Sequence, residues 1–224
     1  MNLSQNIKNT DIAEEVAKCL LKINAVTFRF DPPYTFTSGL KSPIYLDNRL
    51  VMSYPSVRNQ IIDFYIQVIK EKISLKNVEW ISATATAAIP QGAWVADRLG
   101  LPMVFVRPST KSYGKGNKVE GFVKKGAKAL IVEDHISTAE SVAGNVQSIR
   151  ELGGKVDFCI ATTTYETRKS QETLAANKVS LLALTTGKII VETAFSMGYL
   201  KKAEKEKVDL WFENPPAWAG KMGL

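Results

Sequence analysis

Two adjacent carboxylates in the middle of the chain have the types and spacing needed to bind a sugar phosphate. Glu133 and Asp134 follow the apolar run 129–132 and precede a hydroxyl-rich turn that opens into a helix pattern. Carboxylates accept hydrogen bonds from ribose hydroxyls, and a helix N-terminus with Ser and Thr hydroxyls holds phosphate. The candidate residues for this site are Glu133, Asp134, His135, Ile136, Ser137, Thr138, Ala139, Glu140 and Ser141.

The same segment also has an interpretation without any ligand. Two solvated acids can simply end a strand. Ser137 and Glu140 fit the S/T-x-x-E capping box, in which side chains satisfy the first backbone N–H groups of a helix. The segment alone does not separate these two interpretations.

A polar, cationic stretch at 107–121 is a second candidate. It contains Arg107, Lys111 and Tyr113 together with three glycines. Long connections without secondary structure in compact domains are commonly functional, and cations between glycine hinges suit a lid over a polyphosphate. A plain flexible surface loop is the alternative.

Two further segments carry weaker signals. The small residues at 82–90 would let a ligand approach the backbone, although tight packing of a helix on a strand explains them equally well. The segment 36–49 contains Lys41 and has the Pro, Gly and Ser punctuation of loops and short strands, for which a structural hairpin is sufficient.

The elements that must position these residues alternate along the chain. Apolar periodicity predicts a parallel α/β sheet, because short apolar strands alternate with helices. In such sheets ligands bind at the carboxyl ends of the strands. The expected helices are 11–23, 55–73, 90–99, 141–152, 166–177 and most of 188–213; the expected strands are 78–82, 103–106, 129–132, 156–163 and 181–184.

Composition narrows the class of protein. The 224 residues, 45% apolar and 23% charged, indicate one globular domain over 1–224. The net charge of +7 fits a phosphorylated small substrate or a lysine-rich surface, and basic residues spread along the chain make a nucleic-acid partner unexpected. No apolar run reaches the ~18–20 residues of a membrane span. The polar N-terminus, two cysteines and single histidine predict a cytoplasmic protein without a signal peptide, disulfide framework or multi-histidine zinc site.

Taken together, four segments resemble the orotate phosphoribosyltransferase family, in order and over nearly the whole chain. The matching pieces are Ser38-Gly39, 41–45 and 47–49; 84–87; Arg107, Lys111, 114–117 and Glu120-Gly121; and 132–134 with 136–138. The resemblance implies a type I phosphoribosyltransferase fold, a central parallel sheet flanked by helices, with a small N-terminal hood contributed mainly by about 25–50.

The resemblance also implies an activity and partners. The family transfers phosphoribosyl from phosphoribosyl pyrophosphate to orotate in pyrimidine (UMP) biosynthesis, with Mg²⁺ bound through the donor pyrophosphate, and it is homodimeric. By resemblance, Arg107 and Lys111 would hold pyrophosphate, Glu133 and Asp134 the ribose hydroxyls, and Ser137 orotate. The turn 137–141 would hold the 5′-phosphate, and the segment 37–41 would line the orotate side.

Several positions depart from the family pattern. Tyr113 stands where the family has a histidine, Ser109 replaces a lysine, Ala139 and Glu140 replace a glycine pair, Ala88 replaces a glycine, and His135 replaces an apolar residue. Glu140 has the largest expected effect, because a carboxylate about 5 Å from a phosphate costs about 3 kcal/mol per unit charge at an effective dielectric near 20. A degenerate, non-catalytic paralogue that binds the donor or a nucleotide, or a transferase for another base, therefore remains an alternative.

Overall fold

The computed structural model describes residues 10–36, 38–108 and 118–224, and at its centre is a six-stranded sheet. The strand order is β10-β9-β8-β5-β6-β7, and every pairing is parallel except that of the edge strand β7 with β6. The predicted central parallel sheet is therefore confirmed. The strands are β5 (Trp80–Thr84), β6 (Met103–Val106), β7 (Val119–Glu120), β8 (Lys128–Ile136), β9 (Lys155–Thr164) and β10 (Ser180–Thr186).

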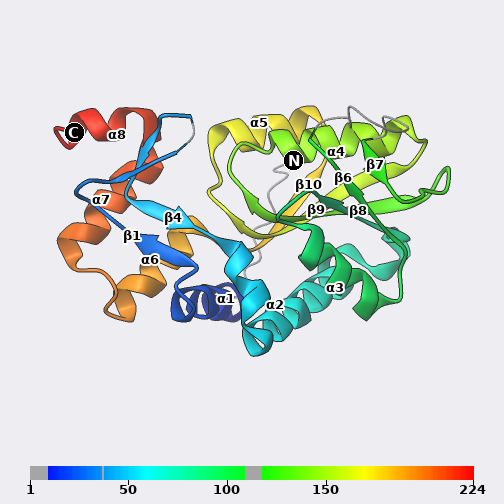
Figure 1. The fold of residues 1–224 in the computed structure, drawn as a ribbon, viewed down its shortest axis with the longest axis horizontal. Coiled ribbons are helices and arrows are strands. Elements are labelled where there is room, and N and C mark those ends of the chain that lie inside the picture. The colour runs from blue at the N-terminus through cyan, green and yellow to red at the C-terminus, as the bar shows by residue number, and fades with distance from the viewer. Residues whose placement is uncertain (1–9, 37, 109–117) are drawn as a thin grey trace.

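Helices cover both faces of this sheet (Figure 1). Helices α4 and α5 lie on one face, and α1, α2 and α3 pack from the other side. Because both faces are covered, the strands are apolar runs rather than alternating ones. The helices are α1 (Thr10–Lys22), α2 (Pro55–Val68), α3 (Ile89–Leu99), α4 (Glu140–Glu151), α5 (Arg168–Ala176), α6 (Gly187–Ser196), α7 (Lys202–Glu213) and α8 (Pro215–Lys221).

Several predicted boundaries were wrong. The helix expected over 55–73 changes to a π-helical turn at Ile69–Ile73. The segment 188–213 is mostly helical, as predicted, and forms two helices separated at 197–201. Helix α8 was not predicted, although Pro215 and Pro216 in its first turn are compatible with a helix start. The strand expected at 129–132 continues to Ile136, because backbone pairing with β9 extends through Thr164.

The strands of the 25–50 segment form a small second lobe with the C-terminal helices (Figure 1). The Trp211 indole Nε1 donates to the carbonyl of Lys41 at 2.9 Å, and Phe36 meets the Trp211 ring edge-on. The C-terminal helices therefore support the backbone of this lobe at Lys41. The strands are β1 (Val26–Phe28) paired with β4 (Ile44–Leu46), and β2 (Tyr34–Thr35) paired with β3 (Lys41–Ser42).

No helix among the described residues is both long enough and apolar enough to cross a membrane.

Candidate functional site

The carboxyl ends of three neighbouring strands meet at one edge of the sheet. Ala83 of β5 is paired with both Phe105 of β6 and Val132 of β8. This register places the 84–88 loop, Arg107 and the acid pair at the same edge, because each directly follows or ends its strand. Three of the segments singled out in the sequence are thus brought together, as expected for a ligand site in a parallel sheet.

Glu133 is a buried carboxyl that joins two of these loops. Its Oε1 accepts a hydrogen bond from the Ser141 hydroxyl at 3.0 Å, and it also interacts with the Thr84 hydroxyl. The Thr84 hydroxyl in turn accepts from the Asn145 amide at 2.9 Å. Burial raises the pKa of Glu133 to about 7, and the hydrogen bonds from Thr84 and Ser141 oppose that rise. The interpretation of Glu133 as a solvated strand-end acid is therefore wrong.

Asp134, by contrast, remains partly exposed. Its backbone carbonyl accepts a hydrogen bond from the Asn48 amide at 2.7 Å, and the same amide donates to the Thr163 hydroxyl at 2.8 Å. Burial raises the pKa of the Asp134 carboxyl, while the nearby Arg49 guanidinium opposes the rise. The sequence did not identify Asn48 as a residue that binds the strand of the acid pair. It lies in the matched 47–49 motif, but nothing local indicated that it reaches the acid pair.

His135 packs against residues at the end of β9. Its Nδ1 lies 2.9 Å from the Thr163 hydroxyl, and its ring contacts Tyr165 edge-on at 4.4 Å between centroids. Burial lowers the pKa of His135 to about 4, so the imidazole is neutral near pH 7. The Tyr165 ring continues the contact to Trp211 at 5.3 Å, which links the site strand to the C-terminal helices. The neighbouring Ile136 side chain is buried in the core.

The turn between β8 and α4 has an open helix start. Ser137 and Thr138 are exposed, whereas Ala139 is buried in a left-handed conformation with φ of 61°. This conformation costs a non-glycine residue on the order of 1 kcal/mol. The predicted capping box is wrong, because no side chain caps α4 and the Glu140 carboxylate lies 3.6 Å from Lys169 Nζ instead. The first backbone N–H groups of α4 thus have no side-chain cap, and we call such a helix start open.

The remaining candidates are only partly described. Arg107 is half-buried, and its guanidinium lies 3.3 Å from a carboxylate oxygen of Glu120. Lys41 donates to the Thr35 hydroxyl at 2.9 Å within the β2–β3 hairpin. Lys111 and Tyr113, together with Ser109 and Thr37, lie outside the described residues, so the structure does not place them relative to the acid pair.

In the parallel sheet, β8 carries the acid pair near its carboxyl end and is followed by a helix start without a side-chain cap. The neighbouring strand β5 is followed by a loop of small residues. Together these features define the type I phosphoribosyltransferase class. A structure of orotate phosphoribosyltransferase from Aeropyrum pernix matches with a TM-score of 0.72 at 28% identity, covering 83% of this chain and 99% of that one.

Sequence comparison identifies the family within that class, although no family model matches the chain. An orotate phosphoribosyltransferase of Coxiella burnetii is 44% identical over 206 residues, which cover 92% of this chain and 98% of that protein. One of Enterococcus faecalis is 41% identical over 209 residues, with 93% and 99% covered. The chain belongs to the orotate phosphoribosyltransferase family.

Proposed function

We propose that this protein transfers the phosphoribosyl group of phosphoribosyl pyrophosphate to orotate, forming orotidine 5′-monophosphate and pyrophosphate. This reaction is a step of pyrimidine biosynthesis. The observation that carries the proposal is the convergence of the 84–88 loop, Arg107 and the 133–141 segment at one edge of the sheet, in a chain that matches its relatives over almost their full length.

The donor would bind across the ends of β5, β6 and β8. The uncapped start of α4 offers backbone N–H groups to the 5′-phosphate, since a helix N-terminus attracts anions. Asp134, the partly exposed acid, would accept hydrogen bonds from the ribose hydroxyls. Arg107, together with Lys111, would hold the pyrophosphate, and Lys41 with Ser137 would lie on the orotate side.

The chemistry requires charge stabilisation and no protein nucleophile. The bond between the ribose C1 and a pyrophosphate oxygen breaks with both electrons going to pyrophosphate, while a ring nitrogen of orotate forms the new bond to C1 and gives up its proton to solvent. Arg107 and Lys111 would stabilise the negative charge that develops on the leaving group. Asp134 would stabilise the positive charge that develops on the ribose.

Mg²⁺ is part of the proposal as a group carried by the donor. Mg²⁺ is commonly bound by one or two carboxylates together with substrate phosphates, and Asp134, the partly exposed acid of the pair, is compatible with such a site. No cluster of three or more His, Cys, Asp or Glu among the described residues forms a separate metal cage. When bound, the ion would neutralise charge on the pyrophosphate.

The test is an assay for orotidine 5′-monophosphate from purified protein, phosphoribosyl pyrophosphate, orotate and Mg²⁺, with adenine and uracil as alternative acceptors. We expect product with orotate and none with the other bases. Product with another base would assign a different acceptor. Donor binding without any turnover would contradict the proposal and favour the non-catalytic alternative.

The assembly and location follow the family expectation. We expect a homodimer in the cytoplasm, and light scattering at micromolar concentration should give twice the chain mass. A strictly monomeric, fully active protein would contradict the expectation of a dimer.

A further inference from the structure

Glu140 and Lys169 form an ion pair directly beside the turn assigned above to the 5′-phosphate. The Glu140 carboxylate lies 3.6 Å from Lys169 Nζ, and the two side chains are 70% and 60% exposed. Glu140 is the first residue of α4, and Lys169 is the second residue of α5. The pair therefore joins the starts of two helices that lie next to each other on one face of the sheet (Figure 1).

A second contact fixes the start of α5 at the same turn. The Thr167 hydroxyl donates to the carbonyl of Ser137 at 2.6 Å and accepts from the Ser170 backbone N–H at 3.1 Å. Thr167 thus caps α5 and binds the turn before α4 with the same hydroxyl. Lys169 is held two residues beyond this contact, which places its ammonium within reach of Glu140.

Glu140 lies at a position where a free carboxylate would oppose the binding of a phosphate. A carboxylate in the first turn of a helix is attracted to the unpaired N–H groups there, and the same groups attract a phosphate. Because α4 has no side-chain cap, a free Glu140 carboxylate would compete with the phosphate for these donors and would repel it.

We propose that Lys169 is a positioning residue for donor binding, which holds the Glu140 carboxylate away from the start of α4 and so keeps the 5′-phosphate position open. This inference depends on the proposed function, since it concerns the donor subsite of that reaction. It explains how a chain with an acidic residue in its phosphate turn retains the site. Lys169 acts through Glu140 and does not itself touch the substrate.

The test is a double-mutant cycle on the dissociation constants of two separate probes, ribose 5-phosphate and pyrophosphate. We expect Lys169→Met to weaken ribose 5-phosphate binding about tenfold in the wild-type background and less than about threefold in a Glu140→Ala background. Pyrophosphate binding should be unchanged, because it occupies the other end of the donor site. Lys169→Arg should restore ribose 5-phosphate binding to within about threefold of wild type, since Arg retains the charge.

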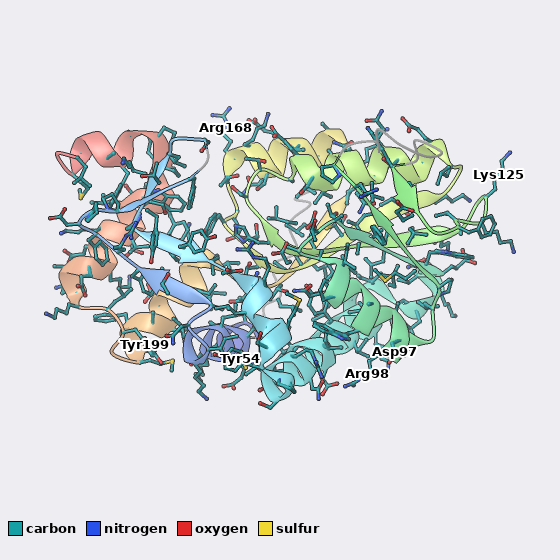
Figure 2. All side chains as sticks on the ribbon, in the orientation of Figure 1. Tyr54, Asp97, Arg98, Lys125, Arg168 and Tyr199 are labelled. Atoms are coloured by element: carbon teal, nitrogen blue, oxygen red, sulfur yellow. The ribbon has the colours of Figure 1, made fainter. Side chains whose placement is uncertain are left out.

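The matched control is Arg168→Met, which removes the same charge from the adjacent residue. The Arg168 side chain is 91% exposed, pairs with Glu172 and points outward from the start of α5 (Figure 2). We expect this variant to bind ribose 5-phosphate as wild type does. Thermal melting of all variants would show that they are folded, since an exposed ion pair contributes little to stability.

Three outcomes would overturn the inference. An equal loss from Lys169→Met in both backgrounds would mean that Lys169 binds the phosphate directly. An equal loss from Arg168→Met would mean that only the local positive charge matters, and no loss from Lys169→Met would mean that Glu140 needs no partner. Absence of donor binding and turnover in the wild type would instead refute the proposed function.

Discussion

Within the described part of the chain, four helices directly follow parallel strands of the central sheet, and they start in two different ways. Helices α5 and α6 are capped by Thr167 and Thr186, whose hydroxyls accept from backbone N–H groups three residues later at 3.1 Å and 3.3 Å. Helices α3 and α4 begin at Ala88 and Ala139 without any side-chain cap.

The difference separates structural helix starts from candidate ligand sites. A helix N-terminus leaves four N–H groups without partners inside the helix. Where the chain supplies a threonine, some of these groups are satisfied internally. Where it supplies alanine, no side chain caps the helix, and both alanine starts follow strand ends proposed to lie at the donor site. At α3 the Ile89 N–H donates to the Thr86 carbonyl at 3.3 Å and Pro90 has no N–H, so α4 offers more free N–H groups to a phosphate.

The largest expected effect comes from placing a negative charge at the open start of α4. Ala139→Asp adds a carboxylate where the 5′-phosphate is proposed to bind, and we expect ribose 5-phosphate affinity to fall about a hundredfold. Measured dissociation constants for ribose 5-phosphate and pyrophosphate check this, with pyrophosphate as the control. Equal losses for both probes would indicate general misfolding of the buried Ala139 position, and no loss would remove the phosphate from this turn.

Glu133 contacts Thr84 at the end of β5 and Ser141 in the first turn of α4, and its raised pKa predicts how stability depends on pH. The Glu133 carboxyl holds its proton more tightly in the folded protein than in the unfolded chain. The free energy of unfolding therefore decreases progressively as pH rises from the ordinary pKa of 4.5 to about 7. Glu133→Gln cannot ionise. Its free energy of unfolding should therefore rise relative to wild type across that range, by at most about 3 kcal/mol.

Urea unfolding of wild type and Glu133→Gln at pH 5 and pH 8 measures this change. His135 titrates in the opposite sense, because its lowered pKa of about 4 makes stability fall as pH decreases from 6.5. That contribution is present in both proteins and cancels in the difference. A difference between the two proteins that is the same at both pH values would mean that the Glu133 carboxyl is not shielded from water.

Asp134 is the partly exposed acid of the pair, whereas Glu133 is buried. Asp134→Asn should weaken binding of phosphoribosyl pyrophosphate by about 1–3 kcal/mol, the range for losing hydrogen bonds to a charged group. Its free energy of unfolding should change less than its binding. Isothermal titration with the donor at fixed Mg²⁺, combined with urea unfolding, measures both, and unchanged binding would mean that the acid does not contact the ribose.

The smallest effect is expected at a capped helix start. Thr186→Ala removes the cap of α6 and should lower the free energy of unfolding by about 1 kcal/mol. Donor affinity should stay at the wild-type value, because the start of α6 has no place in the proposed site. If the variant is as fully folded as wild type but binds the donor more weakly, the distinction between capped and open helix starts would be wrong.

The fold was largely predictable because its signals are local. Apolar runs and helical periodicity located the parallel strands and most helices, and Gly100 correctly marked the end of α3, where it adopts a left-handed conformation with φ of 63°. The edge strand β7 and helix α8 were missed. Two residues of strand and a seven-residue helix that begins with two prolines carry too little periodic signal to stand out.

The sequence by itself determined the order of the elements, the acid pair and the four segments that resemble the family. Only the tertiary structure decided which acid is buried, that Asn48 holds the strand at Asp134, that His135 faces Tyr165, and that Glu140 turns to Lys169. The physical reason is that periodicity reports on neighbours within a few residues along the chain. Burial and charge pairing depend instead on segments such as Asn48 and Asp134, which are 86 positions apart and meet only when the sheet and its helices pack.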